Sequence, residues 1–363
     1  MNLQNKHIFA VIMAGGAGTR FWPLSREKTP KQVLSITSDI SLLSETVSRI
    51  SGLVPKENIL IVTSRKQVEV IRPQINGIKE SNIIIEPTPR NTSPCIGLAA
   101  IHIMRRDPDG IMLVLPSDHL IMDDAAFLTK VQTGLELVSE NDPLVTIGIK
   151  PTRPETGYGY IQFENNGSSL PKDVYAVKAF AEKPNRATAS RFVESGDFYW
   201  NSGIFMWSAQ RILSEIEEHI PEQYEHLMFI DSGFDLDNFE DHITSHYNRI
   251  KPISIDYGIM EVTSSPIFMI SADFGWSDIG SWDELSRIFA NGHEENVIRG
   301  ETVVVDSESN FIYSPDKLTA VIGMENVLVV NTPDATLICP LDRAQEVKMI
   351  VEKLRKDGRK EYL

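Results

Sequence analysis

The sequence predicts an α/β protein with a mixed, mostly parallel sheet flanked by helices, followed by a small all-β unit. Short apolar runs alternate with amphipathic segments through the first two thirds of the chain. A glycine-rich segment follows the first apolar run directly, and short β-branched runs recur every eight or nine residues near the carboxyl end. The first two patterns indicate βαβ units that bind a ligand where a strand ends, and the third indicates a separate β unit.

Each apolar run is short enough for a single strand and is expected to be buried on both faces. The runs are His7–Ala14, Asn58–Thr63, Asn82–Glu86, Gly110–Leu115 and Leu144–Ile149. Helical patterns lie between them at Leu42–Ile50, Gln67–Ile75, Ser93–Arg105 and Phe127–Ser139. This alternation predicts right-handed crossovers between parallel strands.

Proline-rich joints at Pro151–Pro154 and near Lys251–Pro252 mark changes in this pattern. Between them we expect strands at Tyr158–Phe163 and Tyr175–Ala181, and helices at Ala187–Ser195 and Ser208–His219. We interpret this segment, roughly residues 151–250, as an insertion that covers one end of the sheet within a first domain of residues 1–290.

Residues 291–363 are expected to form a second domain. Its apolar runs have centres near Val304, Ile312, Val321, Val329 and Ile338, with turn-forming residues between them. That spacing fits either a sandwich fragment or short turns of a β-helix, and a helix at Asp342–Lys356 closes the chain. A small β unit has open sheet edges that a second copy of the chain could cover, which favours a homodimer.

Composition excludes several classes of protein. The formal net charge of −15 over 363 residues argues against a nucleic acid as the main partner. No run approaches the ~20 apolar residues of a membrane span, so we expect no membrane association. Cys95 and Cys339 lie far apart in apolar settings and are expected to be reduced thiols. We therefore expect a cytoplasmic protein.

The glycines Gly15, Gly16 and Gly18 follow the first strand. Glycines in this place let the backbone approach a ligand and present its N–H groups to phosphate oxygens, whereas the alternative is a tight strand-to-helix turn. Phe21 breaks the dinucleotide pattern G-x-G-x-x-G, and no Gly-Lys-Ser/Thr ends the loop as it would in a P-loop. The segment is therefore predicted to be a phosphate loop of another type.

Two cations flank this loop. Arg20 ends it, and Lys31 follows eleven residues later. Together they can neutralise a triphosphate. The alternative is that both are surface cations beside an ordinary turn, which their combination with the glycine loop disfavours.

The segment Gly15–Arg26, with Pro30-Lys31-Gln32, resembles the signature of the sugar-phosphate nucleotidyltransferases. Its Trp-Pro-Leu-Ser-Arg and Pro-Lys-Gln variants are similar to those of mannose-1-phosphate guanylyltransferases. The resemblance spans essentially the whole chain, and it implies a Rossmann-like (GT-A-type) domain and a short C-terminal left-handed β-helix. It also implies that GTP reacts with α-D-mannose 1-phosphate to give GDP-mannose and pyrophosphate, with Mg²⁺ as the cofactor.

The resemblance further implies which residues bind the nucleotide. Gly15, Gly16, Gly18, Thr19 and Arg20 would hold the GTP phosphates, Lys31 would lie by the reacting phosphates, and Glu86, Asn91 and Thr92 would lie near the nucleoside. A carboxylate can accept hydrogen bonds from the N1–H and N2–H₂ groups of guanine together, so Glu86 is a candidate for guanine selection. The alternative for Asn91 or Thr92 is an ordinary helix N-cap.

Two acids are candidates for a magnesium site. Asp118 ends a buried strand, at the edge where open α/β sheets bind ligands, and its carboxylate suits Mg²⁺. Asp278 resembles the family's second metal ligand, although either acid could simply form a turn. His119 is not expected to act as a base, because the attacking phosphate oxygen is already ionised at about pH 7.

The sugar site is expected further along the chain. Gly157 and Gly159 lie on either side of Tyr158 inside a strand-like run, where glycines are typical of a bulge or of close ligand approach. The resemblance implies that Gly157, Tyr158, Glu182 and Asn201 bind the sugar and that Lys183 meets its phosphate. A surface ion pair is the alternative for Glu182 and Lys183.

The expected mechanism is an in-line displacement that Arg20, Lys31, Asp118 and Asp278 promote by positioning and charge. The alternatives are a related nucleotidyltransferase with another sugar 1-phosphate or base, and a non-catalytic sensor of nucleotide sugars. Longer family members carry a cupin-type isomerase domain. The chain ends at Leu363, too early for that domain, so we expect no phosphomannose isomerase activity.

Overall fold

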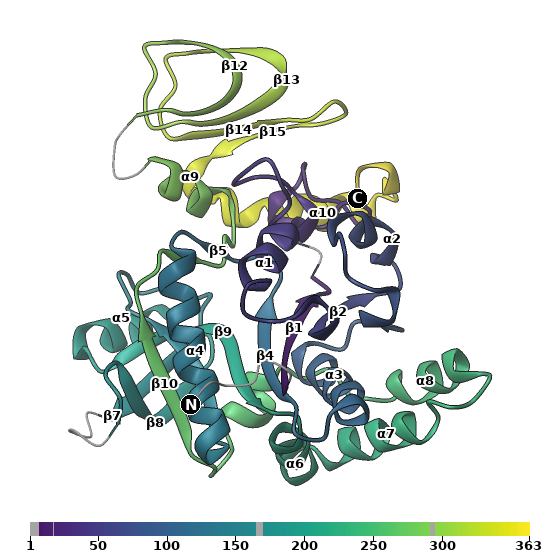
Figure 1. Ribbon diagram of the computed structural model, residues 1–363. Coiled ribbons are helices and arrows are strands. Elements are labelled where there is room, and N and C mark those ends of the chain that lie inside the picture. The colour runs from purple at the N-terminus through teal and green to yellow at the C-terminus, as the bar shows by residue number, and fades with distance from the viewer. Residues whose placement is uncertain (1–6, 17, 165–169, 291–294) are drawn as a thin grey trace.

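The computed structural model describes residues 7–16, 18–164, 170–290 and 295–363. A large sheet covered by helices forms the body of the molecule, and a smaller sheet lies at one end, above α9 (Trp282–Ala290) in Figure 1. This α/β architecture with a C-terminal β unit confirms the predicted fold class. Within the described ranges, every helix is too short or too polar to cross a membrane.

The large sheet has nine strands in the order β3-β2-β1-β4-β9-β6-β10-β8-β7. Their bounds are β1 Ile8–Ala14, β2 Ile59–Ser64, β3 Ile83–Glu86, β4 Ile111–Pro116, β6 Leu144–Ile149, β7 Tyr160–Glu164, β8 Val174–Ala181, β9 Phe198–Ser208 and β10 Ile267–Ala272. β1 is parallel to β2 and β4, whereas β9 is antiparallel to β4 and β6. The sheet is therefore mixed, and all predicted apolar runs are strands in it. It is not mostly parallel as predicted, because among the described residues four strand pairings are parallel and five are antiparallel.

Helices cover both faces of this sheet (Figure 1). Their bounds are α1 Leu42–Ile50, α2 Val68–Ile71, α3 Thr92–Arg106, α4 Asp124–Asn141, α5 Arg186–Ser195, α6 Ala209–His219, α7 Pro221–Ser232 and α8 Phe239–Tyr247. Ile8 and Ile12 of β1 pack in one core with α1 and α4, while Phe9 and Val11 pack in the other with α3 and α6. Burial on both faces explains why β1 reads as a continuous apolar run.

Strand β9 is the main element that sequence patterns did not predict. Its centre was interpreted only as part of a binding motif, yet it pairs with β4 and β6 in the middle of the sheet. Gly203 has φ 71°, and the pairing with β6 shifts register between Thr146 and Gly148, so the strand is irregular. Ser208, expected to begin a helix, is instead the N-cap of α6 and accepts a hydrogen bond from the Arg211 amide.

The segment 151–250, interpreted as an insertion, contributes β7, β8 and β9 to the large sheet and carries α5 to α8. β7 and β8 pair as an antiparallel hairpin at the sheet edge. The expected domain boundary between residues 290 and 291 borders residues 291–294, which lie outside the described residues. The division into two domains therefore stays a prediction.

The C-terminal sheet has the order β12-β13-β14-β15, with bounds β12 Val297–Val305, β13 Phe311–Ile322, β14 Val327–Asn331 and β15 Thr336–Pro340. β12, β13 and β14 are parallel neighbours, as in successive turns of a β-helix, and β15 returns antiparallel. The Asn310 amide supports the turns by donating to Asn296 Oδ1 and to the Met324 carbonyl. This β-helix-like unit is one of the two forms that the run spacing allowed.

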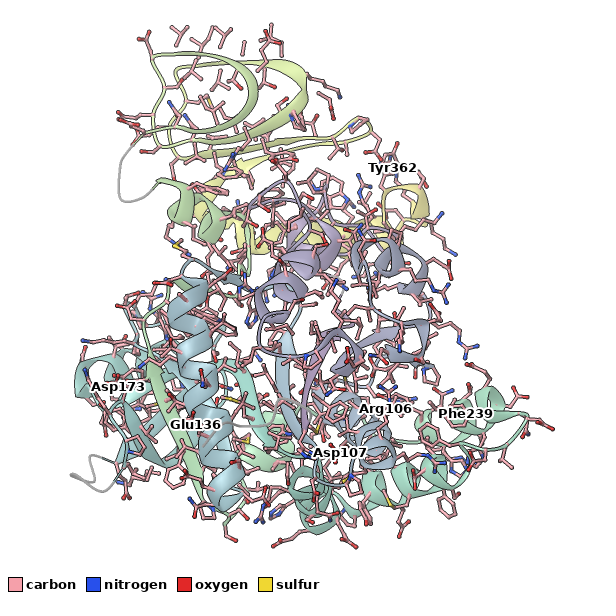
Figure 2. All side chains as sticks on the ribbon, viewed as in Figure 1. Arg106, Asp107, Glu136, Asp173, Phe239 and Tyr362 are labelled. Carbon is pink, nitrogen blue, oxygen red and sulfur yellow. The ribbon has the colours of Figure 1, made fainter. Side chains whose placement is uncertain are left out.

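A third apolar core joins the C-terminal unit to the glycine loop. Phe21 and Trp22 pack there with Trp282 and with Phe311 of β13. The Trp22 indole donates to the Tyr362 carbonyl at 2.8 Å, and Tyr362 is labelled at the C-terminal end in Figure 2. The predicted last helix begins later than expected, since a 3₁₀ segment (Leu341–Glu346) precedes α10 (Val347–Lys356). Both segments pack against the residues that follow the loop.

Candidate active site

Adjoining cavities open beside the glycine loop, where β1 and β4 end. The loop cavity, of about 270 Å³, is lined by Gly18, Thr19, Arg20, Phe21, Lys31, Asp118, His119, Asp278, Ile279 and Gly280. The inner cavity, of about 180 Å³, shares His119 and Asp278 with it. An outer cavity of about 710 Å³ shares Arg20 and Asp278 with the loop cavity. The structure thus brings the loop, both predicted cations and both predicted acids to one place.

The loop turns sharply after β1. Gly18 has φ 60° and ψ 37°, in the left-handed region, and a Cβ there would lie 2.2 Å from Lys31 Cβ. Behind the loop, Ser25 Oγ donates to the Gly18 carbonyl at 2.7 Å, and Gln32 Nε2 donates to the Ala14 carbonyl at 3.1 Å. These bonds fix the backbone that presents Thr19 and Arg20 to the loop cavity.

Gly18→Ala is expected to destabilise the fold by at least about 1–2 kcal/mol, because an L-residue is strained at this φ and its methyl group would displace Lys31. Urea denaturation measures the loss. Gly16→Ala is the matched control, because Gly16 has no positive φ and no described atom lies within 4 Å of the position that a Cβ would take there. Equal destabilisation by both substitutions would contradict the prediction.

Lys31 connects the two predicted acids. Its side chain is 6% exposed, and Nζ lies 2.9 Å from Asp118 Oδ2 and 2.5 Å from the Asp278 carbonyl oxygen. Burial opposes ionisation of Asp118, but the charge of Lys31 and its hydrogen bond hold the pKa of the Asp118 carboxyl below the usual value. The Asp118 carboxylate is therefore ionised at neutral pH.

Asp278 belongs to a group of acids around Tyr158. The Tyr158 hydroxyl lies 2.8 Å from Asp278 Oδ1 and 2.7 Å from Glu284 Oε1. A hydroxyl has one hydrogen and can donate to only one of them. Burial, followed by the charge of Glu284, raises the pKa of Asp278. The pair therefore either shares a proton or requires an added positive charge.

His119 lies beside Asp118 and lines both the loop cavity and the inner cavity. Its Nδ1 accepts from the Trp276 indole at 3.2 Å, and burial lowers the pKa of the imidazole to about 4. His119 is consequently neutral at physiological pH, so its Nδ1 can accept the hydrogen bond from Trp276.

Arg20 is exposed, and its Nη1 donates to the Gly280 carbonyl at 3.0 Å. It lines the loop cavity and the outer cavity, which further cations also line: Arg153, Lys183, Arg186 and Arg287. The acids Glu155, Asp278, Asp283 and Glu284 line the outer cavity as well, so its wall carries charges of both signs.

The predicted base loop follows β3. Asn91 is the N-cap of α3 and accepts from the Thr92 amide at 2.8 Å, while Thr92 lines the inner cavity. Glu86 is buried and accepts a hydrogen bond from the Tyr247 hydroxyl. Its second oxygen, Oε2, lies 3.4 Å from the position of a Cβ on Gly15, so a side chain at that position would contact the Glu86 carboxylate. Its role in guanine selection stays a prediction.

Glu86→Gln is expected to change the pH dependence of stability. Burial raises the pKa of Glu86 to about 7 in the folded state, above the ordinary 4.5, although Tyr247 opposes the shift. The stabilisation linked to this proton is full below about pH 4.5 and is lost as pH rises through about 7. Relative to Glu86→Gln, the parent protein should therefore lose up to roughly 3 kcal/mol over that range. Urea denaturation from about pH 4.5 to 8 tests this, and parallel curves for the two proteins would contradict it.

The predicted sugar residues line the inner cavity together: Gly157, Tyr158, Glu182, Lys183 and Asn201. Lys183 Nζ forms an ion pair with Glu182. A Cβ on Gly159 would lie 2.4 Å from Glu182 Oε2, so a larger residue there would displace the Glu182 carboxylate. The structure thus contains both the predicted cavity and the ion pair that was the alternative for Glu182 and Lys183.

Comparison with known proteins gives the family. Residues 9–295 match the family model described as Nucleotidyl transferase. The chain belongs to the nucleotidyl transferase family. Residues 300–354 of this nucleotidyltransferase match a second model, described as MannoseP isomerase/GMP-like beta-helix domain, which agrees with the parallel strands seen there.

Two curated relatives of this nucleotidyltransferase are longer than the chain, because the match covers about three quarters of each. A mannose-1-phosphate guanylyltransferase of Escherichia coli is 39% identical over 360 residues, which cover 98% of this chain and 75% of the relative. A putative mannose-1-phosphate guanylyltransferase of Vibrio cholerae serotype O1 is 38% identical over 356 residues, 97% and 75% of the two chains. A crystal structure from Thermus thermophilus, described as a mannose-1-phosphate geranyltransferase, has a TM-score of 0.87 and 33% identity, over 96% and 99%. The resemblance and the enzyme class predicted from the sequence are confirmed.

Several side chains of the nucleotidyltransferase site were missed by the sequence analysis. Glu284 accepts from Tyr158 and, at 2.9 Å, from Ser277 Oγ, and Arg153 lies 3.3 Å from it. Asp256 lines the inner cavity and accepts from Asn201 Nδ2 at 2.7 Å. Tyr158 and Arg153 are distant from Glu284 in the sequence, and Asn201 is distant from Asp256, so no local pattern could have indicated these contacts.

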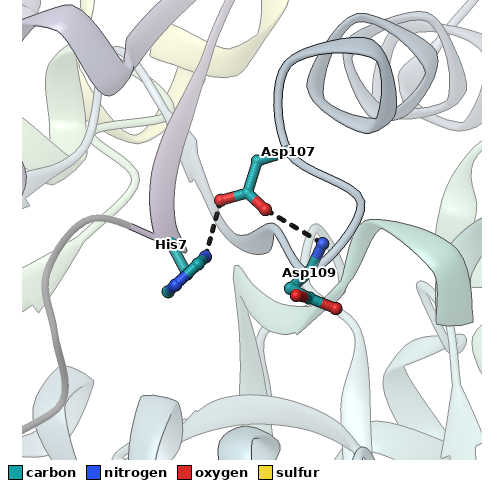
Figure 3. A group of neighbouring side chains, drawn as sticks. All are labelled: His7, Asp107 and Asp109. Atoms are coloured by element: carbon teal, nitrogen blue, oxygen red, sulfur yellow. Dashed lines mark hydrogen bonds and ion pairs between the residues drawn. The ribbon is translucent and has the colours of Figure 1, made fainter.

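Figure 3 shows a different acidic group, His7, Asp107 and Asp109, whose ligand atoms lie within 4.8 Å of one another. His7 Nδ1 lies 2.7 Å from Asp107 Oδ2, and Asp107 accepts from the Asp109 amide. His7 precedes β1, whereas the glycine loop follows it, so the two places are roughly 20 Å apart. This group links the residues that precede β1 and β4 and is remote from the loop cavity.

Proposed function

We propose that this nucleotidyltransferase transfers GMP from GTP to α-D-mannose 1-phosphate, forming GDP-mannose and pyrophosphate. The observation that carries the proposal is a loop cavity lined by Arg20 and Lys31 that adjoins a cavity lined by Glu182 and Lys183. One end suits a triphosphate, and the other suits a hydroxyl-rich ring with a phosphate. The names of the relatives support guanine as the base and mannose as the sugar.

The reaction is an in-line displacement. An oxygen of the sugar phosphate attacks the α-phosphorus of GTP, the bond from that phosphorus to the bridging oxygen breaks, and pyrophosphate leaves. No proton has to be removed, because the attacking oxygen is already ionised, and a neutral His119 agrees with this. Arg20 and Lys31 stabilise charge on the phosphates, and Lys183 orients the incoming sugar phosphate.

Asp118 and Asp278 fit a magnesium ion. Both line the loop cavity, and burial with Glu284 nearby disfavours ionised Asp278 until a positive charge is added. Two carboxylates together with substrate phosphates are a usual environment for Mg²⁺. The bound ion would withdraw charge from the phosphate oxygens.

The remaining assignments are part of the same proposal. Gly15, Gly16, Gly18 and Thr19 approach the phosphates; Glu86, Asn91 and Thr92 lie toward the base; Gly157, Tyr158 and Asn201 lie toward the sugar. Residues 1–290 are the catalytic domain, and residues 291–363 support the loop through the core that contains Phe21 and Trp282.

The test is pyrophosphate release by the purified protein with Mg²⁺. GTP, ATP, UTP and dTTP are each combined with mannose, glucose and galactose 1-phosphates. The highest kcat/KM is expected for GTP with mannose 1-phosphate. A different preferred pair would indicate a related nucleotidyltransferase, and release from no pair would indicate a sensor.

We also propose that the enzyme is a homodimer. Large apolar side chains of the C-terminal sheet are exposed: Ile298, Val303, Val305, Leu318, Ile322 and Ile338. Exposed apolar groups gathered on one small unit are typical of a contact surface. Light scattering should give the mass of two chains, and a monomer at micromolar concentration would contradict the proposal.

A further inference from the structure

Asp256 is an acid of the inner cavity to which sequence analysis gave no role. It begins the π-helical turn Asp256–Met260, and its carboxylate is partly buried at the cavity wall with Glu182, Lys183 and Asn201. Asn201 Nδ2 donates to Asp256 Oδ1 at 2.7 Å. Asp256 is thus in direct contact with a residue assigned to the sugar.

The backbone before Asp256 is held firmly in place. The Ile255 amide donates to Thr92 Oγ1 at 2.8 Å, and the Ser93 amide donates to the Ile253 carbonyl at 3.1 Å. Both partners belong to the start of α3, which is packed on the large sheet. These hydrogen bonds fix the backbone from which the Asp256 side chain projects into the cavity wall.

The Asn201 amide is already partly used within the protein. Its Oδ1 accepts from the Gly203 amide at 3.1 Å and lies 3.4 Å from Thr146 Oγ1, and one hydrogen of its Nδ2 is donated to Asp256. A carboxylate can accept about four hydrogen bonds, and among the described residues the Asp256 carboxylate has one side-chain donor, Asn201. Asp256 therefore has more acceptor capacity at the cavity wall than Asn201 has.

The charges of the cavity set the direction of a bound ligand. Burial and the charge of Glu182 raise the pKa of Asp256 to about 6, so its carboxylate is mostly ionised at neutral pH. Glu182 and Asp256 repel a phosphate and attract hydroxyl donors, while Lys183, which also lines the outer cavity, attracts the phosphate. A sugar phosphate would lie with its ring hydroxyls toward the acids.

We propose that Asp256 is a specificity-determining residue, which accepts a hydrogen bond from a ring hydroxyl of the sugar phosphate. The inference rests on the proposed function, since it names a determinant of the same sugar site. A missing hydroxyl leaves this partly buried acceptor without its donor, so the site discriminates against deoxy sugars. Glu182 and Asp256 would then accept hydrogen bonds from different hydroxyls of the sugar ring.

The experiment crosses Asp256→Asn with single-hydroxyl deletions of the substrate. Pyrophosphate release is measured for the parent enzyme and the variant with mannose 1-phosphate and its 2-, 3-, 4- and 6-deoxy analogues. With mannose 1-phosphate, Asp256→Asn should raise KM about 10- to 100-fold and leave KM for GTP within about twofold. One deoxy analogue should be a poor substrate for the parent enzyme and equally poor for the variant.

The matched control is Asp241→Asn, an exposed acid of α8 that lines none of these cavities. Equal additional losses with every analogue would show that Asp256 only positions Asn201 and would overturn the proposal. If Asp256→Asn does not fold, Asp256→Glu serves instead; an unchanged order of preference among the analogues would also overturn it. Failure of the parent enzyme with mannose 1-phosphate is a separate result, which rejects the proposed function.

Discussion

Asp278→Asn is expected to lower kcat by about 100-fold or more at saturating substrates, and Asp118→Asn by a similar factor. Each substitution removes one negative charge from the loop cavity while nearly preserving the shape of the side chain. The cation that offsets phosphate charge would then be held by one carboxylate instead of two. The measurement is Mg²⁺-dependent pyrophosphate release with GTP and mannose 1-phosphate.

Asp273→Asn is the control for both substitutions. It removes the same charge from an exposed position five residues before Asp278, outside the cavities described above. Its turnover should match that of the parent enzyme. Near-normal Mg²⁺-dependent turnover in both Asp118→Asn and Asp278→Asn would reject the metal assignment.

Elements with a regular local pattern were predicted well. Strand β1 is apolar at every position because both of its faces are buried, and α1 has an amphipathic pattern over its observed length, Leu42–Ile50. Strand β9 carries polar Asn201 and Ser202 and a left-handed Gly203 between its apolar residues. The polar residues and the glycine that line the cavity interrupt the alternation of apolar and polar residues in β9, so this strand could not be recognised from periodicity.

The candidate site shows the same limit. The loop from Gly15 to Arg20 is contiguous in the sequence, so its chemistry could be inferred from its spacing. Asp256, in contrast, depends on Asn201, 55 residues away, and Glu284 depends on Tyr158, 126 residues away. Asp256 lies in the turn Asp256–Met260, Glu284 lies in α9, and Tyr158 precedes β7, so only the tertiary fold brings the partners together and no short motif contains both.

Lys31→Met is expected to lower kcat/KM by about 100- to 1,000-fold, as for loss of one electrostatic stabiliser in a preorganised site. The methionine keeps the apolar stem, which packs against Gly18, but removes the ammonium group. That group lies 2.9 Å from Asp118 Oδ2 and 2.5 Å from the Asp278 carbonyl, so phosphate would enter a cavity with two acids and one cation fewer. Initial rates over a range of GTP and mannose 1-phosphate concentrations measure the loss.

Lys28→Met separates this effect from a general loss of charge. Lys28 is exposed three residues before Lys31 and does not line the loop cavity, so its variant should keep the parent kcat/KM. A purely structural Lys31, which only holds Asp118 and Asp278 together, would lower thermal stability but leave kcat of the folded fraction near normal. The electrostatic role requires kcat to fall in fully folded protein, because charge on the leaving pyrophosphate is greatest in the transition state.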